Sequence, residues 1–400
     1  MSKYYIILTP GITNMGGSEM FTANKSQYLR KHGWNVSVFY FISDGKVLIP
    51  ELKQYDGNCI PELIYNFTYC NKKLRNSIIN KVICGINCCD EVVIESHLLG
   101  LGFWGEIIAK KVGGKNILCP LEENIPQVSV KEAAFLEWKM RRWEILNGSE
   151  NSYKRIFNSL YKVEYNRYVH DYLRIQCSNV VSDASADLSA VLPSDFTILS
   201  VGRLDKPYIL PAIKEVNSFV MLHADKIFNL LVVGGSPNGS VENAIDKICS
   251  NTKNLRVYHF GYLFPVPANI VRTADVAFSS SNSVLVSANQ GVPTIAIDIN
   301  DHQPLGVYGS TINNLFVREN EQYMSLAQWL DVVLFEQPFH KAIPDIQNDE
   351  REFEKAFDRQ IEFLSKSVCD SNFYPVEHMY SKITYLINNV KFYIHKIINN

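Results

Sequence analysis

The chain has 400 residues, of which 46% are hydrophobic, 12% aromatic and 20% charged, and its formal net charge is -2. That length is too great for one hydrophobic core and suits two domains, and the composition is typical of a globular protein. The near-neutral charge gives no reason to expect nucleic acid as a partner. The nine cysteines are an odd number, which argues against a closed disulfide framework, and no apolar run is long enough to span a membrane. We therefore predict a cytoplasmic protein that binds no nucleic acid.

Short apolar runs alternate with helical patterns in the first part of the chain. Strands are predicted at 4–9, 35–41, 91–96 and 115–121. A helix should follow the first strand and stop at Gly33, and another should end at Gly113. This order of strand, helix and strand predicts a parallel sheet that is covered on both faces.

Between 128 and 174 the pattern changes to helical segments rich in aromatic and basic residues. Nine Lys and Arg residues stand against six acids here, an excess of three. Packed helices with a charged face are the favoured interpretation of so mild an excess. The alternative is peripheral contact with a membrane surface, at the inner face of the membrane.

Alternation returns after the linker-like stretch 182–195, and we place a domain boundary between 185 and 186. Strands are predicted at 197–202, 229–235, 255–261 and 274–278, with helices at 210–225 and 241–249. A short helix from 283 or 284 and one more strand should complete a second doubly wound α/β domain. Ligands of such sheets lie beyond the carboxyl ends of the strands.

Two features of this second domain point to an anionic ligand. Five polar residues, Ser279 to Ser283, stand between a strand and a helix, whereas capping the helix requires only one of them. A phosphate held by backbone N–H groups and hydroxyls explains the excess better. Arg203 and Lys206 follow the strand 197–202 and would face the same ligand, although two solvated loop charges are the alternative.

Five segments of the chain occur in the order expected of GT-B glycosyltransferases, and they are most similar to glycosyltransferase family 4. They are "GGSEMFTANKSQYLRKHGWNV", "ILSVGRLDK", "LLVVGGSPNGSVENAI", "VYHFGYL" and "TADVAFSSSNSVLVSANQGVPTIAID". The resemblance implies a GT-B α/β fold, with two Rossmann-like doubly wound domains facing a cleft. The domains would be 1–185, joined by a crossover helix at about 375–400, and 186–374.

The resemblance also assigns residues of the second domain to the nucleotide-sugar donor. Arg203 and Lys206 match the Arg/Lys pair on the donor diphosphate, and Lys206 lies closer to Arg203 than is usual in the family. Gly234 begins the glycine turn after the second strand, and Tyr262 falls beside the nucleobase. The serine turn and its helix add four donor-binding residues: Ser281, Asn282, Ser283 and Ser287.

In the first domain, Gly16 and Gly17 match the glycine loop that approaches the donor. His97 stands where the family often has a polar residue facing the sugar, and a histidine tied into a loop by hydrogen bonds is the alternative. Glu122 and Glu123 follow a strand and are candidate acceptor-side carboxylates, although a solvated loop pair is the favoured interpretation.

The sequence departs from the family at the serine turn. The family carries two glutamates, eight positions apart, that approach the donor sugar and its ribose. No acid lies between Asp275 and Asp298, and the place of the second glutamate falls at Val286 or Ser287. Transfer does not require them outright, because its main demand is to stabilise charge on the departing diphosphate.

The resemblance therefore implies a retaining hexosyltransferase that needs neither cofactor nor metal. It would use a UDP- or GDP-linked donor and a glycan or lipid-linked acceptor in surface-polysaccharide biosynthesis. Two alternatives stay open: a transferase-like subunit without catalysis that supports a partner enzyme, and a nucleotide-sugar epimerase on the same fold.

Overall fold

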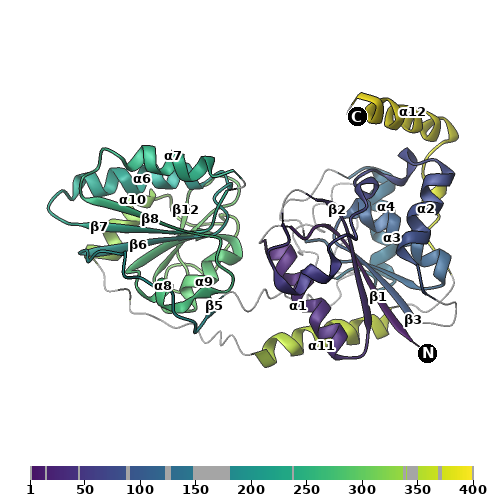
Figure 1. Cartoon of the computed structure of the whole chain (residues 1–400), viewed down its shortest axis with the longest axis horizontal. Helices are drawn as coiled ribbons and strands as arrows, with labels where there is room; N and C mark the ends of the chain where they lie inside the picture. Colours follow the sequence, from purple (N-terminus) through teal and green to yellow (C-terminus); the bar gives the residue numbers. More distant parts are fainter. Residues whose placement is uncertain are drawn as a thin grey trace. The chain divides into compact units, whose positions relative to one another are not determined.

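The computed structural model divides the chain into two compact units (Figure 1). It describes residues 2–13, 16–43, 46–86, 91–121, 128–146, 181–236, 238–336, 339, 350–367 and 372–398. The first unit consists of Met1–Gln176 and Arg351–Asn400, and the second of Cys177–Glu350.

The first unit is built on a parallel sheet with the strand order β2-β1-β3-β4. Its strands are β1 (Lys3–Gly11), β2 (Asn35–Ile42), β3 (Glu91–Ser96) and β4 (Lys115–Leu118). Its helices are α1 (Gly17–Lys31), α2 (Lys72–Val82), α3 (Leu99–Val112), α4 (Val130–Arg141), α11 (Glu350–Lys366) and α12 (Lys382–Ile398). Short 3₁₀ segments are η1 (Pro50–Tyr55), η2 (Pro61–Ile64), η3 (Phe67–Tyr69) and η7 (Val376–His378).

One face of this sheet packs against apolar side chains, and the other face includes a buried ion pair. Ile6 and Ile94 belong to an apolar cluster that also contains Trp104 of α3. The opposite face meets α1, where Lys25 is ion-paired with Glu95 of β3. Both faces are therefore covered, as the apolar strand sequences predict.

The second unit has a sheet with the strand order β12-β11-β10-β6-β7-β8, which is parallel except for β12. Its strands are β6 (Phe196–Val201), β7 (Phe228–Val233), β8 (Leu255–Gly261), β10 (Val276–Ser280), β11 (Thr294–Ile297) and β12 (Pro304–Val307), with β5 (Val181–Ser182) and β9 (Val266–Pro267) forming a separate parallel pair. Its helical segments are α6 (Ile209–Leu222), α7 (Ser240–Cys249), α8 (Ala268–Arg272), η5 (Ser281–Ser283), α9 (Val284–Ala288), α10 (Leu326–Asp331) and η6 (Val332–Glu336).

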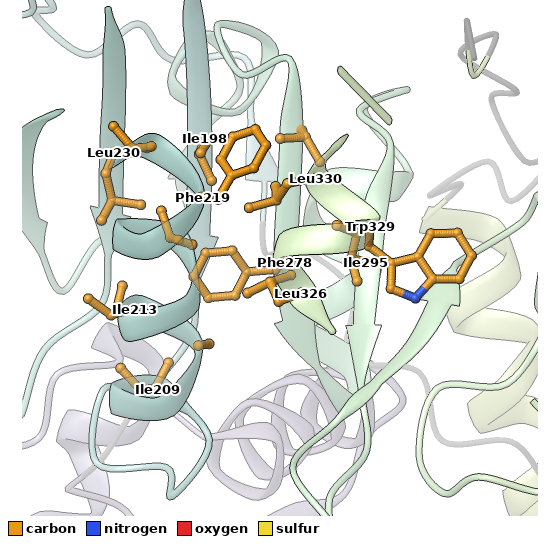
Figure 2. Packing of buried hydrophobic residues seen from close by; sticks show 14 of the residues in the cluster. Ile198, Ile209, Ile213, Phe219, Leu230, Phe278, Ile295, Leu326, Trp329 and Leu330 are labelled. Atoms are coloured by element: carbon orange, nitrogen blue, oxygen red, sulfur yellow. The ribbon is translucent and has the colours of Figure 1, made fainter. Parts of the chain in front are cut away.

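Alternate residues of these strands face opposite layers of helices. Ile198 and Leu230 point to the layer of α6 and α10, where Phe219 and Leu330 pack against them (Figure 2). The neighbouring residues on the strands belong to a second apolar cluster, on the side of α8 and α9 (Figure 1). Because β11, β10, β6, β7 and β8 run parallel, their carboxyl ends lie along one edge of the sheet, which is where a ligand site is expected.

The division into units differs from the predicted boundaries at two points. Val181 and Ser182 already belong to the second unit, because β5 pairs with β9 there. Helix α11 belongs to the first unit, although we predicted that the chain returns only at about 375. Phe357 of α11 packs on Phe21 of α1, and the Lys25 ammonium donates to Gln360.

The described part of the aromatic and basic segment, 128–146, is packed into the first unit. Lys139 of α4 is buried between the carboxylates of Glu106 and Glu144, with N···O distances of 2.5 and 2.8 Å. Arg142 lies over the Trp138 ring and pairs with Glu144. This part is therefore packed against the first unit, and the rest of the segment lies outside the described residues. No helix among the described residues combines the length and apolar character that crossing a bilayer requires.

Candidate functional site

The order of the strands places a switch point in the sheet of the second unit. From β6 the chain proceeds outward through β7 to β8, and it then returns to β10 on the other side of β6. The connections after β6 and β10 therefore diverge, and in sheets of this kind a ligand is expected beyond the carboxyl ends of the strands at this point. Arg203 follows β6 and the serine turn follows β10, so the two predicted anion-binding features meet at this switch point.

Two glycines bring the backbone close together at this edge. Gly202 and Gly234 have φ values of 138° and 136°, a conformation that side chains rarely adopt. A Cβ on Gly234 would overlap the carbonyl oxygen of Gly202. The Gly202 amide donates to Val233 and the Gly234 amide to Gly261, at 2.9 and 2.8 Å. The glycines thus continue the hydrogen-bonding of the sheet into the loops that bear the site residues.

The serine turn lies against the first of these glycines. A Cβ on Gly202 would be 3.4 Å from Ser283 Oγ. Ser281 is buried and has a positive φ of 56°, and its amide donates to Leu315. Neither Ser280 nor Ser283 makes a side-chain hydrogen bond that caps the following helical segment. The capping interpretation of the polar run therefore has no support from the hydrogen bonds of this turn.

The helix after the serine turn is short, as predicted. Helix α9 begins at Val284, as predicted, and it has only five residues, preceded by a three-residue 3₁₀ turn. So short a helix has few aligned peptide dipoles, and its N-terminus contributes little by itself. The hydroxyls and loop amides of Ser281–Ser283 must supply most of any anion binding at this turn. Ser287 lies within α9 and is fully buried.

Arg203 and Tyr262 occupy the same edge of the sheet. The Arg203 side chain is 41% exposed, and its Nε lies 3.5 Å from Asp205 Oδ1. The Tyr262 ring lies against Gly235, where a Cβ would be 2.6 Å from ring atom Cε2. Burial raises the pKa of Tyr262, the charges of Asp205 and Glu242 raise it further, and the charge of Arg203 lowers it. Lys206 directly follows Asp205 and is half-buried.

Sequence reasoning did not find a hydrogen-bonded pair at the end of β7. The Ser236 amide donates to Glu242 Oε1 at 2.8 Å, and the Ser236 hydroxyl donates to the other carboxylate oxygen. Burial raises the pKa of Glu242, but these hydrogen bonds outweigh it and the pKa is lowered. Glu242 therefore stays ionised and holds the loop between β7 and α7. The only signal in the sequence was a serine six residues before a glutamate, which is too common to interpret.

The predicted glycine pair of the first unit forms the beginning of α1. Gly16 is the N-cap, and its amide donates to Glu19 Oε2 at 3.0 Å. The Ser18 hydroxyl donates to the same oxygen at 2.9 Å, and Gly17 is the exposed first residue of the helix. A carboxylate already occupies this helix N-terminus, which disfavours a phosphate at the same position.

His97 belongs to a buried polar network at the carboxyl ends of β1 and β3. Its Nδ1 is 3.1 Å from Thr9 Oγ1, and its Nε2 is 3.1 Å from Glu95 Oε1. The other oxygen of Glu95 accepts from Lys25 Nζ at 2.5 Å and from the Tyr5 hydroxyl. His97 is fully buried, so this geometry favours the alternative of a histidine fixed by hydrogen bonds. The network itself, with a buried lysine on α1, was not predicted.

Three candidates remain: Glu122, Glu123 and Asn282. Glu122 and Glu123 lie outside the described residues. Asn282 follows Ser281 in the serine turn and is exposed. Among the residues that the structure describes, no group of three or more His, Cys, Asp or Glu side chains is placed to hold a metal ion.

Comparison with known proteins identifies the fold. The sequence matches no protein-family model and no curated protein. The structure is similar to a glycosyltransferase from Rickettsia africae ESF-5, which is 16% identical, with 100% of each chain covered and a TM-score of 0.56. It is also similar to a Listeria monocytogenes protein assigned as a UDP-N-acetylglucosamine 2-epimerase, which is 12% identical, with 90% of this chain and 95% of that chain covered and a TM-score of 0.53. Anabaena HepE in complex with UDP-glucose is 10% identical, with 99% and 100% covered and a TM-score of 0.50.

These similarities define the class of the fold. The chain has the GT-B α/β fold, with a Rossmann-like parallel sheet in each unit, as the sequence predicted. The glycosyltransferases and the epimerase-like protein share this architecture with it at low sequence identity.

Proposed function

We propose that the protein is a glycosyltransferase whose second unit binds a nucleotide-sugar at the switch point between β6 and β10. The donor is UDP- or GDP-linked, and the acceptor is a glycan or a lipid-linked glycan in surface-polysaccharide biosynthesis. UDP is the first choice, because the similar HepE structure contains UDP-glucose and the Listeria protein is assigned to a UDP-sugar.

One observation carries this proposal. Gly202 directly precedes Arg203 and lies against Ser283 of the serine turn. A cation and several hydroxyl and amide donors therefore lie together beyond the carboxyl ends of two adjacent strands, β6 and β10. A diphosphate fits this combination, because charge-assisted hydrogen bonds from Arg and neutral donors complement its oxygens. The exposed part of the Tyr262 ring offers a surface for a nucleobase.

The chemistry that these residues can perform is the stabilisation of a leaving group. As the glycosidic bond to the nucleotide breaks, negative charge grows on the diphosphate, and Arg203 with Lys206 opposes that charge. The missing glutamates remove carboxylate contacts with the sugar and ribose but leave these cations in place. A retaining transfer without a metal, in which the donor phosphate takes the acceptor proton, needs no protein base at this site.

An epimerase is the second candidate, and its support is the similarity to the Listeria protein. Both activities start from a bound nucleotide-sugar, so nucleotide binding does not separate them. Incubation of the protein with a nucleotide-sugar alone does: an epimerase interconverts sugars without an acceptor, and a transferase does not. A non-catalytic subunit binds the nucleotide and does neither.

The first experiment is a thermal-shift panel of UDP, GDP, ADP and CMP. We expect one of the first two to raise the melting temperature, followed by isothermal titration with that nucleotide. Arg203→Ala should weaken binding about tenfold or more, since a hydrogen bond to a charged group contributes about 1.5–3 kcal/mol. The matched control is Arg272→Ala, an exposed arginine that precedes β10 and bonds Gln290 at the other edge of the sheet. If the two variants bind the nucleotide with equal affinity, the nucleotide does not contact Arg203.

A further inference from the structure

Helix α12 exposes a continuous apolar stripe that no described residue covers. Five aliphatic side chains on it are between 48% and 69% exposed: Ile383, Leu386, Ile387, Val390 and Ile394. Their spacing of three and four residues places them on one face of the helix. Burial of such a face normally stabilises a helix, so its exposure calls for a partner.

The opposite face of α12 fixes this orientation. Phe392 packs edge-on against Tyr65 with ring centroids 5.1 Å apart. Asn388 and Asn389 donate to the hydroxyl and carbonyl oxygens of Thr68, at 2.9 and 3.0 Å. The helix is therefore attached to η3 through these residues, and the apolar stripe points away from the first unit. Figure 1 shows α12 at the outer edge of that unit.

The charged side chains of α12 itself all have one sign. From Met379 to Asn400 the sequence contains Lys382, Lys391 and Lys396 and no acidic residue. Lys382 and Lys391 are exposed and nine residues apart, which is about two and a half helical turns, so they emerge on opposite sides of the stripe. Lysines that flank an apolar face are typical of helices that lie in the head-group region of a membrane.

The charge distribution also selects among possible partners. In a symmetric contact between two copies, the lysines of one stripe would approach those of the other without an acid to compensate. An anionic lipid surface satisfies both the apolar face and the lysines. The helix is roughly 26 Å long, shorter than the ~30 Å hydrocarbon core, which suits a helix that lies along the surface.

We propose that α12 docks the first unit on an anionic lipid surface, with the apolar stripe in the acyl boundary and Lys382 and Lys391 among the head groups. The site differs from the segment 128–174, and its existence does not depend on the proposed transferase activity. It would hold the enzyme at the surface where a lipid-linked acceptor resides.

Vesicle flotation of the full-length chain tests the proposal. The wild type should bind vesicles of phosphatidylcholine with about one-third phosphatidylglycerol, and its binding should fall at high salt because screening weakens the lysine contribution. Vesicles of phosphatidylcholine alone should retain much less protein. Absence of binding to the anionic vesicles would overturn the proposal.

Paired variants assign the binding to α12. Leu386→Ser with Val390→Ser should reduce binding at least tenfold, and both side chains are exposed, so the circular dichroism and the nucleotide response should persist. The control is Met221→Ser with Leu222→Ser, which removes two exposed apolar side chains from the second unit and should bind as the wild type does. If the stripe variant still binds the vesicles, another segment makes the membrane contact and the proposal is contradicted. A different result would identify a second copy of the chain as the partner. In that case the wild type would form concentration-dependent dimers and bind no vesicles, and the stripe variant alone would lose the dimers.

Discussion

Gly234 has no room for a side chain, since a Cβ would overlap the carbonyl oxygen of Gly202. Gly234→Ala forces these two loops apart and also places alanine at a φ of 136°. We expect a loss of about 3 kcal/mol or more in the free energy of unfolding, from steric overlap and backbone strain together. Gly239→Ala is the matched control, because its φ is also positive but nothing lies within 4 Å of the added Cβ. That variant should lose about 1 kcal/mol. Urea denaturation measures both, and equal losses would contradict the steric argument.

Helix capping and phosphate binding predict opposite effects of a carboxylate at position 283. A carboxylate near a helix N-terminus is neutral or slightly favourable, by about 0.3–1 kcal/mol. If Ser283 faces a diphosphate, Ser283→Asp places like charges close together, which costs several kcal/mol at an effective dielectric of about 20. We expect a variant that melts at or above the wild-type temperature and no longer binds its nucleotide in isothermal titration. Normal binding by this variant would remove the serine turn from the donor site.

At the scale of elements, α1, α11 and β3 are held together by buried charges. Lys25 of α1 bonds both Glu95 of β3 and Gln360 of α11 and is only 1% exposed. Burial raises the pKa of Glu95, but the charge of Lys25 and the hydrogen bond from His97 outweigh it and lower the pKa from 4.5 to about 2. The carboxylate is therefore stabilised in the folded state relative to the unfolded chain.

This depressed pKa predicts acid sensitivity of the first unit. The stabilisation is fully present above the unfolded pKa of 4.5 and is lost as the pH falls through about 2. Its size is about 3 kcal/mol, from roughly 1.4 kcal/mol per pKa unit. In Glu95→Gln the loss of stability between pH 5 and pH 2.5 should be smaller than in the wild type.

Tryptophan fluorescence follows this unfolding, because Trp34 and Trp104 are buried in the first unit. Glu354→Gln is the control for the pH series. Glu354 is a partly exposed carboxylate on α11 that pairs with Lys31 of α1. Its variant should keep the wild-type pH dependence, and a wild-type pH dependence in Glu95→Gln would contradict the assignment.

At the scale of the whole molecule, the proposed nucleotide contacts all come from the second unit. The first unit should therefore affect transfer without affecting nucleotide affinity. Gly17 is the exposed first residue of α1, so we expect a valine at this position to leave the helix folded. Gly17→Val should lower the rate of sugar transfer and leave the dissociation constant of the nucleotide unchanged.

The control for this prediction is Lys31→Ala at the other end of α1, which should retain both properties. Parallel loss of transfer and nucleotide binding in Gly17→Val would mean that the glycine contributes to holding the nucleotide. Unchanged transfer would remove Gly17 from the reaction.

The sequence by itself determined the local elements and the class of the fold. The apolar strand runs, the glycine stops and the order of the motifs predicted two Rossmann-like units, because hydrophobic periodicity is a local property of the chain. The strand 255–261, the start of α9 at Val284 and the glycine turn at Gly234 agree with the structure.

Only the tertiary structure decided which of these residues meet. Contacts between distant segments leave no periodic signal, so the overlap of Gly234 with Gly202 and the bond from Ser236 to Glu242 were not predictable. The place of α11 was not predictable either. It belongs to the first unit because Lys25 donates to its Gln360 and Phe21 packs against its Phe357. His97 and Lys25 illustrate the reason: the sequence does not state the environment of a polar residue, and only the structure shows that both side chains are buried and bonded to Glu95.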